Sequence, residues 1–275
     1  MNRSVRLASI LASFVASSIA VGAQWASHPT PGVPRLADGK PNLTAPAPRT
    51  PEGRPDLSGN WEVPGGFGRA ERPPAPPPGT PPVAYFWNAG AGFADDLPFQ
   101  PWARELKKTR MASESKDNPD ALCLPMGFMQ FHTHPQPRKM IQTKDLLVII
   151  YEVNYGLRTI YLDGRPKPAN DPQPWWYGYS RGWWEGDTLV VETTNLKDDI
   201  WLDVNGSALT SSATVTERFR RPNFGTLEID VTVDDPKAYT KPWTVRVNQK
   251  VMVDSELIEF ICHENQQFGT RVKLD

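Results

Sequence analysis

The chain has 275 residues, with 30 lysines and arginines against 31 aspartates and glutamates, and a formal net charge of −1. This balance leaves no basic excess for nucleic acid and no acidic tail, so we expect no nucleic-acid partner. Hydrophobic residues make up 39% of the chain and charged residues 22%, a globular composition. The length allows one large domain or two small ones.

Residues 1–23 have the pattern of a secretory signal peptide. Arg3 and Arg6 form a positive start, residues 7–21 carry no charge, and Ala23 ends a run of small residues suited to cleavage. The apolar stretch is shorter than the roughly 20 residues that a spanning helix needs, and no later segment is long enough. We therefore predict a secreted or periplasmic protein without a transmembrane segment.

Export changes how the two cysteines are interpreted. Cys123 and Cys262 are the only cysteines in the chain. In an oxidising compartment such a pair more often forms a disulfide than a reactive thiol, so the sequence predicts a Cys123–Cys262 bond. Two buried free thiols, or Cys123 as a metal ligand, are the alternatives.

Proline is concentrated early in the chain and sets the predicted organisation. Sixteen of the 29 prolines fall between Pro29 and Pro82, and proline disfavours both helix interiors and sheets. We predict a proline-rich arm over 24–55 and a single β domain over 56–275. Within that domain, 64–139 is an insertion of loops around one short helix at 101–111, and 83–139 is expected to wrap the outside.

From residue 140 onward, short runs of alternating polar and apolar residues predict strands separated by turn residues. The predicted strands are 140–151, 157–162, 177–184, 188–194, 213–220, 227–233, 243–251 and 257–263, with a further strand at 57–63. Glu185-Gly186-Asp187 has the composition of a tight hairpin turn. Many short strands at regular spacing favour an all-β antiparallel barrel or strongly curved sheet, with a β-sandwich as the alternative.

Four motifs in this region resemble one widespread family of secreted bacterial proteins of uncharacterised function. They are Asp163-Gly164-Arg165-Pro166, the WEGDTLVV run at 184–191, the TERFRR run at 216–221 and the DDPKAYTKPW run at 234–243. The resemblance covers about residues 56–265 and implies export and a shared fold, but no activity. Members often carry a histidine in the segment that here spans 206–210, where this chain has none. Separately, Gly59-Asn60-Trp61 is similar to the Gly-x-Trp that begins the first strand of lipocalin-like barrels, where the tryptophan closes one barrel end.

Charged residues on apolar strand faces are the strongest candidates for function. Alternate residues of a strand share a face, so Arg158 lies with Ile160, and Glu217 lies with Val215 and Phe219. The same pattern places Glu152 with apolar residues of 146–150, and Glu259 and His263 with those of 257–261. A buried lone charge is costly, so such groups pair or line a wet cavity.

We therefore expect Arg158 to pair with Glu217 or Glu152 inside a barrel, as the polar floor of a small-molecule pocket. An ion pair that only fixes strand register, or a glutamate that reaches solvent at a strand end, is an alternative of equal weight. The expected ligand contacts are Glu152, Tyr161, Trp175, Trp176, Tyr177, Trp183 and Glu259.

A second cluster lies between residues 123 and 140. Its members are Cys123, Met126, Met129, His132, His134 and Met140, which are soft ligands of the kind that copper sites use. The spacing fits no closed zinc motif, so we interpret the segment as a surface loop with two incidental histidines and predict no metal. No phosphate-loop or dinucleotide motif is present in the sequence, so no cofactor is predicted.

Three classes of function remain open. The first is a secreted barrel that binds a small hydrophobic or aromatic molecule. The second is a cofactor-free lyase, isomerase or hydrolase, with Glu217 as base, Arg158 as orienting group and His263 as an acid/base partner. The third is an envelope protein whose tryptophan-rich surface meets a partner.

Overall fold

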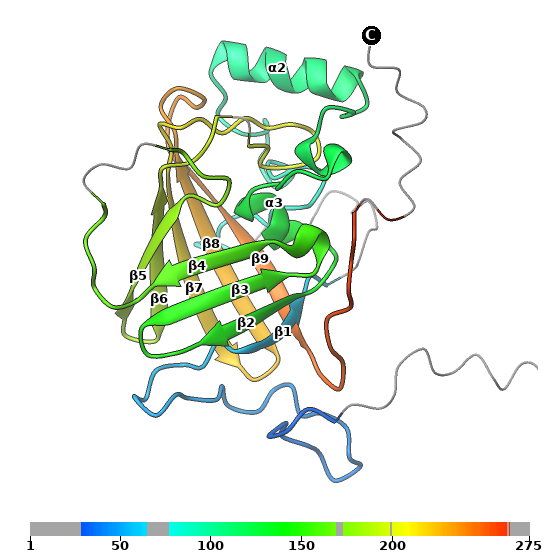
Figure 1. Ribbon diagram of the computed structural model, residues 1–275, viewed down its shortest axis with the longest axis vertical. Helices are drawn as coiled ribbons and strands as arrows, with labels where there is room; N and C mark the ends of the chain where they lie inside the picture. The colour runs from blue at the N-terminus through cyan, green and yellow to red at the C-terminus, as the bar shows by residue number, and fades with distance from the viewer. Residues whose placement is uncertain (1–28, 65–76, 169–172, 199, 263, 265–275) are drawn as a thin grey trace, which may run out of the picture.

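The computed structural model describes residues 29–64, 77–168, 173–198, 200–262 and 264, so the predicted signal peptide and His263 lie outside the described residues. Nine strands close into one barrel in the chain order β1 to β9 (Figure 1). The all-β barrel prediction is therefore confirmed, and the sandwich alternative is wrong. The strands are β1 Gly59–Glu62, β2 Arg138–Gln142, β3 Leu146–Tyr151, β4 Leu157–Tyr161, β5 Tyr179–Glu185, β6 Thr188–Thr194, β7 Thr214–Asn223, β8 Thr226–Asp234 and β9 Trp243–Met252.

The odd number of strands explains why one pair of neighbouring strands in the barrel runs parallel. Strands that alternate in direction can close a ring only when their number is even. Here β1 pairs antiparallel with β9. With nine strands, one pair of neighbours must therefore run parallel, and that pair is β4 and β5. That seam is short, with only Ile160–Ser180 and Tyr161–Arg181 in register. The connection between β4 and β5 has to return along the barrel, as parallel strands require.

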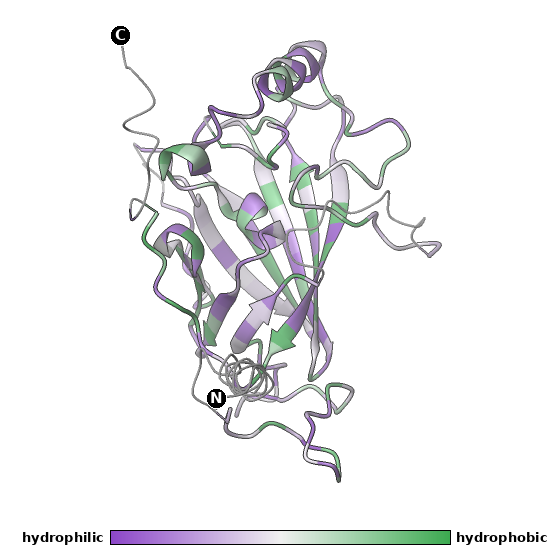
Figure 2. Ribbon diagram, turned by 90° about the vertical axis from the view of Figure 1, so that its right-hand side faces the viewer, coloured by the Kyte–Doolittle hydropathy of each residue, from purple (hydrophilic) through white to green (hydrophobic). Residues whose placement is uncertain are grey.

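The core follows from the period-two pattern of the strands. Along β8, Leu227, Ile229, Val231 and Val233 are all buried, and the residues between them are half-buried. Figure 2 shows the same alternation of hydrophobic and hydrophilic residues along neighbouring strands. Burying one face of each strand in this way is what stabilises a small closed barrel.

Two strand predictions needed correction. The predicted strand 140–151 is a hairpin of β2 and β3, because Thr143 makes a turn in which its backbone N–H donates to the Leu146 carbonyl. The predicted strand 257–263 is wrong over the residues described, since 257–262 contain no strand. The hairpin turn at Gly186-Asp187 is confirmed between β5 and β6.

Helices cover one end of the barrel. The α2 helix, Pro101–Ala112, matches the predicted helix and lies at the top in Figure 1. The α3 helix, Phe128–Thr133, lies between α2 and the strands, and all six of its side chains are buried. The expectation that 83–139 wraps only the outside is therefore wrong for α3. Short 3-10 turns at Pro119–Leu122 and Val153–Tyr155 complete the helical segments.

The N-terminal segment crosses the opposite end of the barrel (Figure 1). Its carbonyls at Leu43 and Ala45 accept hydrogen bonds from the backbone of Gly225 and Phe224 in the β7–β8 turn. Beside it, Trp61 is fully buried, and the Arg221 guanidinium stacks on its ring at 4.8 Å. This tryptophan helps to close the barrel at that end.

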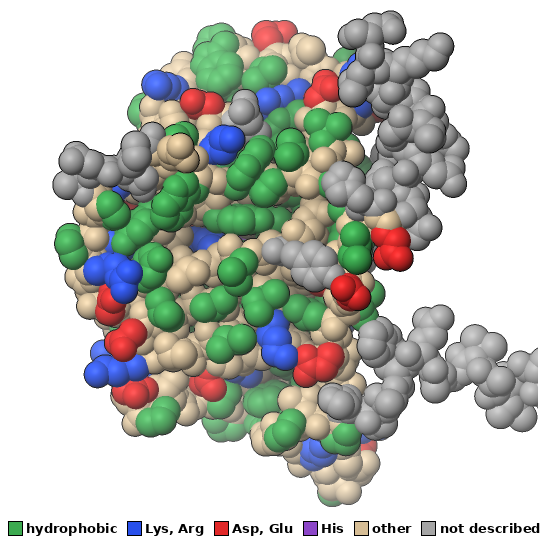
Figure 3. All heavy atoms as spheres, viewed as in Figure 1, with side chains coloured by type: hydrophobic (Ala, Val, Ile, Leu, Met, Phe, Trp, Pro, Cys, Tyr) green, Lys and Arg blue, Asp and Glu red, His purple; other side chains and the backbone are tan. Residues whose placement is uncertain are grey.

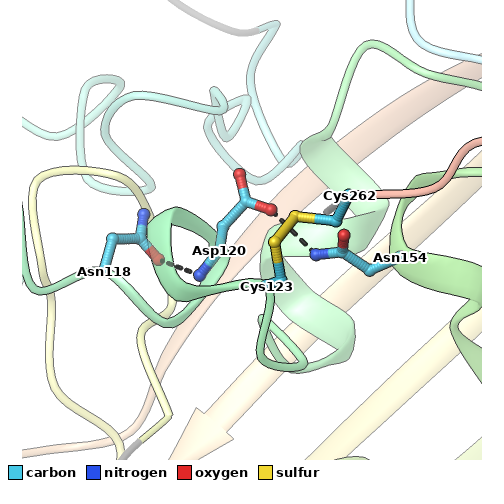
Figure 4. The surroundings of a disulfide bond; sticks show 5 residues. All are labelled: Asn118, Asp120, Cys123, Asn154 and Cys262. Carbon is cyan, nitrogen blue, oxygen red and sulfur yellow. Dashed lines mark hydrogen bonds between the residues drawn. A yellow bond between two sulfur atoms is a disulfide. The ribbon is translucent and has the colours of Figure 1, made fainter. Parts of the chain in front are cut away.

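A disulfide joins Cys123 to Cys262, as the sequence predicted, with 5.6 Å between the two Cα atoms (Figure 4). Beside it, the Asn154 side chain donates to the Asp120 carboxylate at 2.9 Å. The bond fastens the segment after β9 to the segment that precedes α3. In the part of the chain that the structure describes, no helix is long and apolar enough to span a membrane.

Candidate functional site

Arg158 and Glu217 meet inside the barrel. Arg158 lies on the inward face of β4 with Ile160, and Glu217 lies on the inward face of β7, as the pleat of each strand predicted. The Arg158 Nη1 donates to Glu217 Oε1 at 2.9 Å, and Nη2 donates to Oε2. The result is a bidentate ion pair, with 1% and 0% of the two side chains exposed.

Arg158 also donates to two hydroxyl groups. Its Nε and Nη2 donate to the Ser180 hydroxyl at 3.3 and 3.2 Å, and Nη2 also donates to the Thr193 hydroxyl at 2.9 Å. The guanidinium lies 4.3 Å from the centre of the Phe128 ring. Burial alone would lower the pKa of Arg158, but the Glu217 carboxylate outweighs burial and raises it. Arg158 is thus a fixed, neutralised cation.

His132 on α3 is the third member of this cluster. Its Nε2 lies 2.7 Å from Glu217 Oε1. Burial lowers the pKa of His132, with further contributions from the Arg158 and Arg138 charges, although Glu217 opposes them. The imidazole is therefore neutral. Because a carboxylate oxygen only accepts, Nε2 carries the proton, and the buried Nδ1 has no hydrogen-bond partner among the described residues.

Glu217 is held as an anion by its two partners. Burial would raise the pKa of the Glu217 carboxyl, but Arg158 and His132 lower it to about 2. Both of its oxygens accept hydrogen bonds, Oε1 from Arg158 and His132 and Oε2 from Arg158. A carboxylate held in this way is a weak base.

Arg138 fixes the end of α3 above the cluster. Its guanidinium is fully buried and donates to the carbonyls of His132, His134 and Gln136 at 2.7, 2.7 and 2.8 Å. Burial lowers the pKa of Arg138 to about 10, which leaves it charged at neutral pH. Arg138 thus supplies the donors that the last carbonyls of α3 lack.

A pocket of about 410 Å³ opens beside this cluster, where β4 and β5 separate. The strands are paired only at Ile160–Ser180 and Tyr161–Arg181, so the start of β4 faces the 174–178 loop without a ladder. Arg158 and Ser180 are the part of the pocket lining that belongs to the cluster. The lining residues are Leu157, Arg158, Thr159, Tyr161, Pro174, Trp175, Trp176, Tyr177, Gly178, Ser180 and Lys197.

Four of the predicted aromatic contacts line this pocket, namely Tyr161, Trp175, Trp176 and Tyr177. Trp183 does not: it is 43% exposed on β5, and its Nε1 donates to Glu185. Figure 3 shows hydrophobic side chains gathered around a hollowed region on the face that carries β4. A second groove of about 750 Å³ shares Trp176 and Lys197 with the pocket and extends to Arg110 and Trp201.

The other predicted carboxylates lie elsewhere. Glu152 is buried, but its Oε2 accepts the backbone N–H of Ile258 at 2.9 Å, so it anchors the segment after β9 and does not meet Arg158. Glu259 is exposed. The expected strand face that would have carried Glu259 does not exist among the described residues. The histidine that pairs with Glu217 is His132, whereas His263 lies outside the described residues.

The surface-loop interpretation of the 123–140 cluster is wrong. Cys123 is bonded to Cys262, and the side chains of His132 and His134 are 0% and 4% exposed. Burial, with the nearby Arg138 charge, lowers the pKa of His134 to about 3. Over the described ranges, no group of three or more histidine, cysteine, aspartate or glutamate side chains is placed to hold a metal.

From the sequence, His132 was interpreted only as an incidental histidine, and Lys197 was not singled out. His132 had a usable signal: it follows Phe128 by four residues in a mainly apolar segment, the spacing of one helix face. The flanking Pro125 and Pro135 concealed it. Lys197 had no signal, because it reaches the pocket only through the contact of its loop with the 174–178 loop.

Comparisons with known protein families, with curated proteins and with solved structures each found no match. The family resemblance of the four motifs therefore stays a prediction, and the case for function depends on the geometry of the site.

Proposed function

We propose that this protein binds a small hydrophobic or aromatic molecule in the pocket between β4 and β5. The observation that carries the proposal is the pocket itself. Its volume of about 410 Å³ lies in the range of small-molecule sites, and it is walled by Tyr161, Trp175, Trp176 and Tyr177. Aromatic rings offer large, rigid contact surfaces at a low cost in conformational entropy.

The Arg158–Glu217–His132 cluster supports this pocket from behind. Arg158 donates to Ser180, Thr193 and Glu217, and the cluster joins β4, β5, β6 and β7 to α3. Such a network holds the pocket floor in one arrangement before a ligand arrives. Binding to a preformed site avoids the cost of ordering it.

The alternative of catalysis with Glu217 as base has less support. Its two oxygens are engaged by Arg158 and His132, and its pKa is about 2. A general base needs a free lone pair within reach of substrate and a pKa near the working pH. The geometry therefore favours a supporting role for Glu217 over proton abstraction.

We also propose that the protein acts outside the cytoplasm. The Cys123–Cys262 disulfide supports this, since such bonds persist mainly in oxidising compartments.

The binding proposal is tested with N-phenyl-1-naphthylamine, a neutral aromatic probe that fluoresces in apolar surroundings. We expect saturable binding that weakens about tenfold in Trp176→Ala, since that change removes one pocket wall. The matched control is Trp183→Ala, because Trp183 is a half-exposed tryptophan outside the pocket. Absence of saturable binding, or equal weakening by both variants, would refute the proposal.

A further inference from the structure

We propose that the ligand is an aromatic carboxylate whose anionic group is bound by Lys197. This inference rests on the proposed function and narrows it from aromatic molecules in general to aromatic anions.

The argument begins with the charges that line the pocket. Arg158 and Lys197 are its charged lining residues, and no aspartate or glutamate is among them. The Arg158 charge is neutralised by its bidentate pair with Glu217, and its Nε and Nη2 donate to the Ser180 and Thr193 hydroxyls. Lys197 is therefore the cation that remains for a ligand.

Lys197 has no ion pair or side-chain hydrogen bond with the residues that the structure describes. Its Nζ lies 4.7 Å from the centre of the Trp176 ring. No ion pair joins it to the neighbouring Asp198, whose carboxylate accepts the backbone N–H of Ser211 at 2.7 Å. Asp117 lines the second groove, but no ion pair joins it to Lys197. A half-buried ammonium on an aromatic face, without a counter-ion among the described residues, is a suitable anion site.

The cation and the aromatic wall belong to one unit. The backbone N–H of Lys197 donates to the Trp175 carbonyl at 3.1 Å, and the Trp175 N–H donates to the Asn195 carbonyl at 2.9 Å. These bonds hold the Lys197 backbone beside the loop that carries Trp176 and Tyr177. A ring packed against this wall would place a carboxylate on its edge near Nζ.

The test compares 2-naphthoate with its neutral counterpart 2-naphthamide by isothermal titration calorimetry. We expect the acid to bind about tenfold more tightly than the amide, and the difference to shrink as salt is raised. In Lys197→Met the preference should fall below about threefold, and in Lys197→Arg it should persist, since the charge is kept. Lys241→Met is the control, because Lys241 is exposed before β9 and lines neither groove.

The outcomes separate the two proposals. If N-phenyl-1-naphthylamine binds but the acid and the amide bind equally, the inference about the anion is overturned and the pocket proposal stands. A preference for the acid that survives in Lys197→Met would also overturn it, since another cation would then be responsible. If none of the three compounds binds, both proposals fail. Thermal melting of each variant establishes that a lost preference is not caused by unfolding.

Discussion

The His132 imidazole on α3 lies 2.7 Å from the Glu217 carboxylate on β7, inside the barrel and out of contact with water. This hydrogen bond ties a helix of six residues to the barrel wall. Because Arg158 binds the same carboxylate from β4, one side chain connects three separate elements. The stability of the barrel end that α3 covers should therefore depend on Glu217.

Glu217→Leu is expected to lower the free energy of unfolding by about 3–5 kcal/mol, because it leaves the Arg158 charge buried without a partner. The double variant Arg158→Met with Glu217→Leu should be less destabilised than Glu217→Leu alone. Guanidinium denaturation measures the free energy of unfolding of both variants. Glu185→Gln serves as control: its partner Arg218 is on the surface, where solvent screens the pair, so stability should barely change. A double variant as unstable as the sum of the two single variants would show that the two groups do not act as a pair.

Stability should fall as the solution is acidified below about pH 6.5. His132 and His134 both have a lowered pKa in the folded protein, so the unfolded chain binds the extra protons. Each histidine can contribute a slope of up to about 1.4 kcal/mol per pH unit below the unfolded pKa. The pKa of Glu217 is about 2 in the folded protein, so this carboxyl causes a further loss of stability only below its unfolded pKa near 4.5.

The measurement is chemical denaturation at pH 7, 6 and 5. His134→Gln should reduce the slope, because the contribution of that histidine is gone while the Glu217 cluster is intact. The same free energy of unfolding at all three pH values would mean that the histidines take up protons in the folded state.

Removing the disulfide is expected to destabilise the protein on the order of 4 kcal/mol, because the bond closes a loop of 139 residues. Cys123→Ser with Cys262→Ser, and the wild type under reductant, should give matching losses in thermal melts. Hydrogen exchange should increase over 253–262, the segment that the bond fastens. Exchange that rises uniformly instead would show that the bond acts on the unfolded chain alone.

Gly178 is expected to tolerate no side chain. Its φ is +63°, and a Cβ there would lie 2.6 Å from Thr193 Cγ2 and 2.7 Å from the Thr194 carbonyl oxygen. Gly178→Ala should cost about 3 kcal/mol and distort the pocket, through left-handed backbone strain together with overpacking. Gly164→Ala, at φ +75° with open space around it, should cost only about 1 kcal/mol. Equal melting temperatures for the two variants would contradict the packing at Gly178.

The alternation of polar and apolar residues was enough to predict most strands. It also predicted that the side chains of Arg158 and Glu217 point into the same interior. Val215, Glu217 and Phe219 share a face in any extended chain, and the turn at Gly186-Asp187 needs only local chemistry. The β2–β3 hairpin was missed, because the apolar residues on both sides of Thr143 led to one predicted strand over 140–151.

The remainder of the site depends on tertiary structure. An isolated helix as short as α3 would not be stable in water, and it forms here because the barrel end buries its six residues. No local signal could show that β4 and β5 run parallel or that Lys197 reaches their opening. The predicted strand at 257–263 failed because Glu152 and Cys123 hold that segment through one backbone contact and one covalent bond, without a ladder.

The parallel seam also has a consequence for protein engineering. A tenth strand added between β4 and β5 would let every neighbour run in opposite directions, and it would cover the opening that Trp176 and Tyr177 now border. Such a chain would have a fully antiparallel wall, and the pocket between β4 and β5 would be closed. An odd strand count requires a parallel pair, and in this barrel that pair is the one beside which the pocket opens.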